Sequence, residues 1–316
     1  MSDLPKSVTI QEEGPREGFQ IEPGPIGIAD KVAFIEALAE TGLRKIDCVS
    51  WVNPKRVPGM ADAEEVARRI TRRPDVRYTG LWLNAQGFRR ALEQPLDLVG
   101  SLVISGSETF NVRNTGKTIE EAFADQAQIL ALYRQHGVDV LWGTVFTAFG
   151  CNYEGEVPLA TVLDRFARLI EIAGEQGVAF QGLYLADTVG WANPRMIQQR
   201  VGAVRERWPD MRIGLHLHDT RGTGLPNALA ALQMGVDQFD ASCAGLGGCP
   251  FAAHKGAAGN ICTEDLVFMC HEMGIETGID LDRLIECGLM AEKIVGHPLP
   301  GKVMKGGSLS RFRAGG

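Results

Sequence analysis

The chain has no long hydrophobic segment, although hydrophobic residues make up 45% of its 316 residues. A helix that crosses a bilayer needs about 20 consecutive apolar residues, and no run in this sequence approaches that length. The first residues, MSDLPKSVTI, also lack the basic and apolar parts of a secretory signal. We therefore expect a cytoplasmic protein without a membrane partner.

Paired cysteine motifs and an excess of basic residues are absent as well. The seven cysteines are scattered without CxxC spacing, which fits reduced intracellular thiols better than a disulfide framework. The formal net charge of −7 lacks the basic footprint that broad nucleic-acid binding needs. With 22% charged residues, the composition is that of a globular protein with a large core, and we expect no nucleic-acid partner.

Short β-rich segments recur about every 30 residues, and each is followed by a segment with helical periodicity. The expected strands span residues 7–12, 44–50, 76–82, 97–105, 138–146, 179–187, 212–218 and 238–244. The main expected helices span residues 29–41, 61–71, 118–136, 159–175, 194–207 and 225–234. Eight strands with intervening helices favour an α/β fold of the (β/α)8 TIM-barrel type over an open doubly wound sheet.

No linker-like segment divides the chain before its C-terminal end. Residues 263–295 follow the eighth expected strand and predict extra helices, which we expect to cap the barrel mouth. Residues 301–316 are rich in glycine and basic residues, which is typical of a flexible tail. We therefore expect a single catalytic barrel domain over residues 1–300, followed by that tail.

Two histidines at positions i and i+2, His216 and His218, end the seventh expected strand. Side chains two apart on a strand point to the same side, and the carboxyl ends of barrel strands form the active-site face. A single histidine there is more often an ordinary core or loop residue. The pair, with the carboxylate of Glu17 after the first strand, favours a divalent-cation site, and mixed nitrogen and oxygen ligands suit Mg²⁺, Mn²⁺, Co²⁺ or Zn²⁺.

Other polar residues follow strands at the same end of the expected barrel. Arg16 could stabilise a developing enolate or carbonyl oxygen, but a salt bridge at the barrel mouth explains it equally well. Cys249 lies in the glycine-rich segment GLGGCP, which could bring it over a substrate as an acid or base. A lone cysteine is usually inert, so the residues alone leave its role open.

Six segments of the sequence, taken in order, carry a family resemblance. They are GPREGFQIE (14–22), SWVNPKRVPGMAD (50–62), FGCNYEG (149–155), ADTVG (186–190), HLHDTRGTGLPNALAALQMGVDQFDASCAGLGGCPF (216–251) and GNICTEDLVFM (259–269). Together they resemble the 3-hydroxy-3-methylglutaryl-CoA lyase family of metal-dependent TIM-barrel lyases, over roughly residues 8–290. That family uses a divalent cation to cleave its thioester to acetyl-CoA and acetoacetate. The resemblance implies this reaction, an acyl-CoA substrate and a homodimer.

The resemblance also implies roles for individual residues. Arg16 would stabilise the enolate of the departing acetyl-CoA, and His216 would help proton transfer. Asp187 would sit near the substrate, and Cys249 would come from a mobile loop. We expect Mg²⁺ or Mn²⁺, with Co²⁺ or Zn²⁺ as alternatives. The metal ligands would be Glu17, His216, His218 and Asn260.

Several residues depart from the family pattern. Glu17 stands where the family has an aspartate, Trp142 replaces an arginine, and Arg221 replaces a tyrosine. We expect the coenzyme A contacts at Lys255 and Asn114. Because these changes concern recognition more than bond cleavage, a 3-hydroxyacyl-CoA with a different substituent remains an alternative substrate. The sequence is also compatible with a condensing acyltransferase of the same superfamily, or with a non-catalytic barrel that binds metal or coenzyme A.

Overall fold

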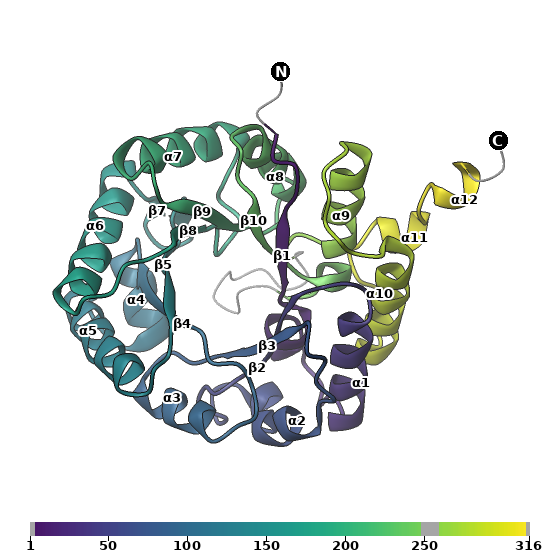
Figure 1. Ribbon diagram of the computed structural model, residues 1–316, viewed down its shortest axis with the longest axis horizontal. Helices are drawn as coiled ribbons and strands as arrows, with labels where there is room; N and C mark the ends of the chain where they lie inside the picture. The colour runs from purple at the N-terminus through teal and green to yellow at the C-terminus, as the bar shows by residue number, and fades with distance from the viewer. Residues whose placement is uncertain (1–3, 248–258, 314–316) are drawn as a thin grey trace.

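The computed structural model describes residues 4–247 and 259–313. Eight parallel strands curl around a central axis, with helices on the outer side (Figure 1). Their order in the sheet is β3-β2-β1-β10-β9-β8-β5-β4. The strands are β1 (Thr9–Glu12), β2 (Lys45–Ser50), β3 (Arg77–Leu81), β4 (Gly100–Ser105), β5 (Val140–Phe146), β8 (Gly182–Ala186), β9 (Arg212–His216) and β10 (Gln238–Ala241). Each corresponds to one expected strand, and the predicted (β/α)8 barrel is confirmed.

Two sets of contacts between strands close the sheet into a barrel. The first barrel strand pairs directly with the last, so that Glu12 of β1 lies opposite Ala241 of β10. The end strands β3 and β4 meet where the backbone N–H of Asp97 donates to the carbonyl oxygen of Tyr78 at 2.7 Å. The carboxylate of Asp97 accepts from the Tyr78 N–H at 2.8 Å. Within the described residues, these contacts replace a ladder between β3 and β4.

Twelve α-helices and a short hairpin complete the described structure. The hairpin follows β5 and consists of β6 (Gly150–Cys151) and β7 (Gly155–Glu156). The helices are α1 (Ile28–Ala39), α2 (Ala63–Arg69), α3 (Ala85–Leu92), α4 (Glu108–Thr115), α5 (Ile119–Gln135), α6 (Leu159–Glu175), α7 (Pro194–Arg207), α8 (Gly224–Gln233), α9 (Thr263–Glu272), α10 (Leu281–Val295), α11 (Val303–Gly306) and α12 (Ser310–Arg313). None of the helices in the described ranges is long and apolar enough to cross a membrane.

Local capping explains where several helices begin. The expected helix at 118–136 is α5, and its N-cap Thr118 forms a capping box with Glu121. Helices α3 and α4, of eight residues each, lie outside the expected set. Asn84 caps α3 and Ser107 caps α4, each accepting a backbone N–H three residues later. These caps are the signals by which a sequence reading could have found the two helices.

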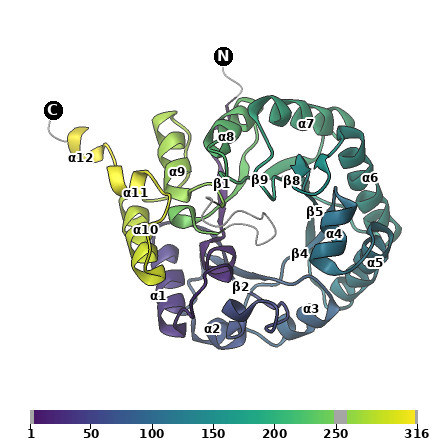
Figure 2. The same cartoon turned by 180° about the vertical axis from the view of Figure 1, so that it is seen from behind.

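The C-terminal helices follow the eighth strand as expected, but they lie beside the barrel. Helix α9 contacts α8, and α10 contacts α1. Both views show them completing the outer ring at its side and not covering the strand ends (Figures 1 and 2). The tail expected from residue 301 is partly helical, because α11 and α12 occupy Val303–Gly306 and Ser310–Arg313. The single domain over residues 1–300 stays a prediction.

The outward faces of the strands supply the hydrophobic core. Ile46, Leu102, Val145, Leu215 and Phe239 come from five strands and are completely buried. Burial of each such side chain stabilises the fold by about 1.5–3 kcal/mol. Because alternate residues on a strand point to opposite faces, the intervening residues of the same strands face the barrel axis. Those inward-facing residues form the site.

Candidate active site

Three candidate metal ligands converge beyond the carboxyl ends of β1 and β9. One donor atom each from Glu17, His216 and His218 lies within 4.8 Å of the other two. The Nε2 atoms of the two histidines are 3.1 Å apart, and the Glu17 Oε1 atom lies 3.3 Å from the His218 Nε2 atom. Two imidazole nitrogens and a carboxylate oxygen facing one point can hold a divalent cation.

Asn260 completes this group from the segment that leads into α9. Its backbone pairs with that of His218 in an isolated antiparallel bridge. Its side-chain nitrogen donates to Glu17 Oε1 at 3.1 Å, while its side-chain oxygen is buried without a hydrogen-bond partner in the described part of the chain. A half-turn of the amide exchanges the two atoms, and the oxygen then faces the Glu17 carboxylate. The unpaired oxygen therefore fits a fourth metal ligand.

Asp240, on β10, orients the His216 ring. The two residues are register partners on neighbouring strands, and His216 Nδ1 lies 3.1 Å from Asp240 Oδ2. Burial lowers the pKa of His216, but the Glu17 and Asp240 carboxylates outweigh burial and raise the pKa to about 9. The proton held by His216 therefore lies where a metal cation, which is also positively charged, could bind in its place. The remaining Asp240 oxygen accepts from the Tyr184 hydroxyl at 3.0 Å.

Arg16 lies beside the proposed metal ligands inside a cage of carboxylates. Its guanidinium contacts Glu17 at 2.9 Å and Asp47 at 2.7 Å, and it also pairs with Glu13. Burial raises the pKa of the Glu13 and Asp47 carboxyl groups, and the nearby Arg16 counteracts this effect. These bonds hold the guanidinium in one orientation, in which it lines the cavity.

A turn with π-helical hydrogen bonding, Gly14–Gly18, brings Arg16 and Glu17 to the mouth. It starts directly after β1, and its backbone N–H groups converge on the carbonyl oxygen of Glu13. The neighbouring side chains Arg16 and Glu17 can then bond to each other at 2.9 Å, while Glu17 also lies 3.8 Å from His216. Single π-helical turns of this kind are frequent at functional sites.

A cavity of about 310 Å³ runs into the barrel from this group of residues. Asn114 of α4 lines it, which is compatible with its expected contact to coenzyme A. Asp187 does not line the cavity within the described residues, although its neighbours Ala186 and Thr188 do. Its Oδ1 atom accepts from the Trp191 N–H at 2.6 Å. Its expected place near the substrate stays a prediction.

Asp187 can still influence the site through electrostatics. Burial raises the pKa of its carboxyl group, and His218 counteracts that effect. Cys249 and Lys255 lie outside the described residues, so their roles stay predictions. The catalytic and ligand roles assigned to the remaining residues also stay predictions, although Glu17, His216, His218, Asn260 and Arg16 all meet at the mouth.

Sequence reasoning missed three residues that shape this site, namely Glu13, Tyr184 and Asp240. Each lies on or directly after an expected strand, at a position whose side chain faces the barrel axis. A charged or hydroxyl-bearing residue at an inward-facing position was the available signal, because barrel interiors are usually filled by bulky branched residues. This signal does not predict which residues the three side chains contact, because those contacts depend on the register between strands.

Comparisons with known proteins agree with this geometry. Residues 7–290 match the family model described as HMGL-like. The chain is 40% identical to the hydroxymethylglutaryl-CoA lyase of Bacillus subtilis, covering 94% of this chain and 96% of that protein. It is 42% identical to the cytoplasmic 3-hydroxy-3-methylglutaryl-CoA lyase of Danio rerio, covering 90% and 82%.

Solved structures give the same answer at the level of the fold. The crystal structure of the Bacillus subtilis HMG-CoA lyase superimposes with a TM-score of 0.88 at 38% identity, covering 96% of this chain and 98% of that one. An HMG-CoA lyase from Acinetobacter baumannii, in complex with coenzyme A and 3-methylmalate, gives a TM-score of 0.87 at 40% identity, covering 96% of each chain. The fold, the residues at the barrel mouth and the family-model match over residues 7–290 show that the chain belongs to the HMGL-like family.

Proposed function

We propose that this protein is a divalent-metal-dependent carbon–carbon lyase. It cleaves a 3-hydroxy-3-methylglutaryl-CoA-like thioester to acetyl-CoA and a 3-oxo acid, which is acetoacetate for the family substrate. The observation that carries this proposal is the convergence of Glu17, His216 and His218 within 4.8 Å at the barrel mouth, with Arg16 beside them. Relatives with about 40% identity over most of the chain are lyases by name.

Glu17, His216, His218 and Asn260 would hold the cation, and Mg²⁺ or Mn²⁺ suits this mixed donor set best, with Co²⁺ or Zn²⁺ as alternatives. When bound, the cation supplies Lewis-acid polarisation of substrate oxygen atoms. The proton of the tertiary hydroxyl group passes to a water molecule, and His216, held in place by Asp240, helps this transfer from its position beside the hydroxyl group. Its second nitrogen stays bonded to the Asp240 carboxylate, which keeps the ring in one orientation.

Bond cleavage places charge where Arg16 can receive it. As the hydroxyl proton leaves, the carbinol carbon becomes a carbonyl, and the electron pair of the broken carbon–carbon bond passes to the thioester fragment. Arg16 stabilises the resulting enolate oxygen with charge-assisted hydrogen bonds. Protonation of the enolate carbon, to which we assign Cys249, then yields acetyl-CoA. Asp187 acts at a distance, through its electrostatic interaction with His218.

Further parts of the proposal concern binding partners and assembly. Asn114 lines the cavity, and we assign it, with Lys255, to contacts with the coenzyme A moiety. We also propose a homodimer in the cytoplasm, by analogy with the family.

Acetyl-CoA release tests the function directly. The purified protein is incubated with 3-hydroxy-3-methylglutaryl-CoA and each of Mg²⁺, Mn²⁺, Co²⁺ and Zn²⁺, and thioesters are separated by chromatography. We expect metal-dependent release that a chelator abolishes. Condensation of acetyl-CoA with a 2-oxo acid, without thioester cleavage, would identify a condensing acyltransferase instead. Tight thioester binding with no turnover under every condition would identify a non-catalytic barrel.

A further inference from the structure

The cavity that starts at the proposed metal ligands extends through the barrel to its amino-terminal end. It is lined there by Lys45 and Arg77, which are the first residues of β2 and β3. On β2, Lys45 lies two residues before Asp47, whose carboxylate is bonded to Arg16. Two residues along a strand span about 6.6 Å. The cavity therefore extends beyond the space that a short acyl group bound near Arg16 would fill.

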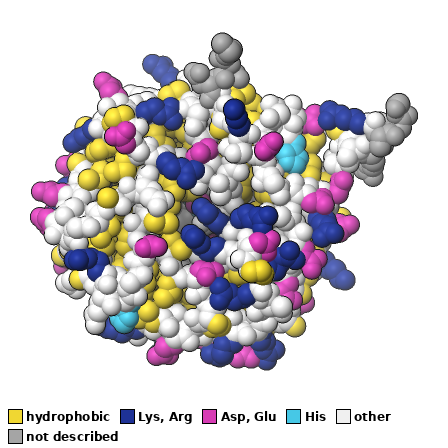
Figure 3. Space-filling view, viewed as in Figure 1, with side chains coloured by type: hydrophobic (Ala, Val, Ile, Leu, Met, Phe, Trp, Pro, Cys, Tyr) yellow, Lys and Arg dark blue, Asp and Glu magenta, His cyan; other side chains and the backbone are white. Residues whose placement is uncertain are grey.

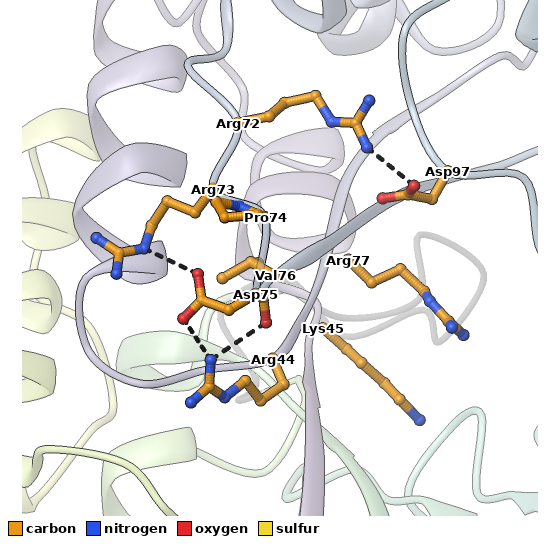
Figure 4. Close-up of a pocket in the computed structure, with 9 residues that line it drawn as sticks. All are labelled: Arg44, Lys45, Arg72, Arg73, Pro74, Asp75, Val76, Arg77 and Asp97. Atoms are coloured by element: carbon orange, nitrogen blue, oxygen red, sulfur yellow. Dashed lines mark hydrogen bonds and ion pairs between the residues drawn. The ribbon is translucent and has the colours of Figure 1, made fainter.

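Lys45 and Arg77 are register partners on neighbouring parallel strands. Two like charges at paired positions of a sheet repel each other, and an anion bound between them would remove that repulsion. Neither side chain has a carboxylate oxygen within 4.0 Å in the described part of the chain. Figure 4 shows both extending in the same direction, with no ion pair drawn to either. Their arrangement is that of an anion-binding pair.

The neighbouring arginines differ from this pair. A hollow of about 580 Å³ on the amino-terminal face is lined by Lys45 and Arg77 together with Arg44, Arg72 and Arg73. The space-filling view shows Lys and Arg side chains gathered around the centre of this face (Figure 3). The three additional arginines pair with Asp75 or Asp97. Lys45 and Arg77 are thus the cations of this hollow that lack such a pair, and they also reach the inner cavity.

The more distant carboxylates of Asp237 and Asp240 do not neutralise the positive charge of Lys45 and Arg77. Burial lowers the pKa of Lys45, and Arg77 and Arg212 lower it further, while Asp240 and Asp237 counteract them. Asp240 is already bonded to His216, and Asp237 forms an ion pair with Arg212 at 3.0 Å. A carboxylate group supplied by a ligand would neutralise positive charge at Lys45 and Arg77.

The wall of the cavity is partly aromatic. Trp142 and Tyr184 meet edge to face, with ring centroids 5.0 Å apart. Each ring lies over a glycine of the next strand, since a Cβ atom at Gly182 or Gly214 would come within 2.2 Å of Trp142 or Tyr184 respectively. The rings therefore present a rigid apolar surface within the same cavity. Such a surface suits a methylene chain.

We propose that the substrate carries, on its carbinol carbon, a chain of several carbon atoms that ends in a carboxylate, and that Lys45 and Arg77 bind this carboxylate. The chain enters the barrel along Trp142 and Tyr184. Arg16 is unsuited to this role, because three carboxylates already surround it. The inference rests on the proposed lyase function and specifies its substrate class.

Binding of free dicarboxylic acids tests the pair without requiring turnover. Calorimetry with the Mg²⁺-loaded protein compares malonate, glutarate, adipate and pimelate with monocarboxylic acids of equal length. We expect the longer diacids to bind most tightly. Lys45→Met and Arg77→Met should each weaken that binding at least tenfold, because each removes one cation. The matched control Arg73→Gln changes an arginine of the outer hollow that does not line the inner cavity, and it should bind like the wild type.

Cleavage assays then connect the pair with the reaction. We expect Lys45→Met to lower kcat/KM at least tenfold for a 3-hydroxyacyl-CoA with the carboxylated chain, whereas the control Arg73→Gln should keep kcat/KM for the same thioester within threefold of the wild type. Equal diacid affinities in wild type, Lys45→Met and Arg77→Met, with thermal unfolding unchanged, would overturn the inference while leaving the lyase function intact. Length-dependent diacid binding without cleavage of any thioester would support the anion site and contradict the lyase function.

Discussion

The Nε2 atoms of His216 and His218 face each other at 3.1 Å. This distance is that of a hydrogen bond, in which the N–H group of one ring donates to the nitrogen of the other. The carboxylate of Glu17 lies against the same pair, 3.3 Å from His218 and 3.8 Å from His216. These three donor atoms point to one place, so they can bind one cation together.

His218→Ala should remove metal binding and activity together. The variant loses one of two converging nitrogen ligands, so we expect the metal affinity to fall about 100-fold or more, which corresponds to ~2.8 kcal/mol. Titration with Mn²⁺, followed by electron paramagnetic resonance, measures the affinity. His136→Ala, at the C-terminal end of α5, is the control and should bind Mn²⁺ like the wild type. Retention of full Mn²⁺ affinity in His218→Ala would remove this residue from the ligand set.

Asp240→Asn should weaken metal binding by changing the protonation of His216. The amide nitrogen of asparagine can donate to Nδ1, which favours the tautomer with its proton on Nε2 and so blocks that nitrogen as a ligand. Loss of such a supporting carboxylate typically costs about 10–100-fold in metal affinity. Calorimetry with Mn²⁺ at neutral pH tests this.

Tyr184→Phe is the matched control for Asp240→Asn. It removes the hydroxyl that bonds to the other Asp240 oxygen but leaves the carboxylate on His216. We expect it to change the Mn²⁺ affinity less than threefold. Similar losses in the two variants would mean that Asp240 acts through Tyr184 and not through the charge on His216.

The fold could be predicted from the sequence because its signals are local. Alternating and continuous apolar segments mark the eight strands, and the spacing of two residues between His216 and His218 places both rings on one side of a strand. The order of residues in the sequence does not show that Glu17 and Asn260 lie beside these histidines. The structure brings both to the histidines, since Asn260 pairs with the backbone of His218.

Contacts that depend on several strands at once could not be predicted in the same way. Arg16 meets Asp47 only because β1 and β2 lie side by side in a particular register. Asp187 directly follows β8, and its side chain bonds to the Trp191 N–H and does not line the cavity within the described residues. The pattern of residue types specifies which face of a strand a side chain occupies, but not which neighbour it contacts there.

Glu17→Asp tests whether the longer carboxylate is adapted to this pocket. One Glu17 oxygen bonds to Arg16 at 2.9 Å, while the other lies near His218 and the Asn260 amide. A side chain shorter by one methylene group cannot maintain both contacts, so we expect metal affinity and kcat/KM to fall about tenfold, or ~1.4 kcal/mol. A large gain in rate on 3-hydroxy-3-methylglutaryl-CoA would contradict this, and would mean that Glu17 has drifted from an optimal aspartate.

Glu12 is a buried carboxylate that joins three segments beneath the active site. It accepts hydrogen bonds from the backbone N–H groups of Gly14 and Cys243, and from the Thr263 hydroxyl at 2.6 Å. Burial raises the pKa of Glu12 to about 7 from an ordinary value of 4.5, and these hydrogen bonds only partly counteract it. The folded protein therefore binds this proton more tightly than the unfolded chain does.

The sign of the pH dependence follows from that difference in pKa. The stabilising contribution of the Glu12 proton is complete below about pH 4.5 and is lost as the pH rises through about 7. Its size is on the order of 3 kcal/mol, because each pKa unit corresponds to about 1.4 kcal/mol. Glu12→Gln removes the titration, so its free energy of unfolding should decline less steeply over this range. Urea unfolding at several pH values measures the slope, and Glu286→Gln, on the exposed side of α10, should keep the wild-type slope. Equal slopes in Glu12→Gln and the wild type would show that Glu12 does not titrate in this range.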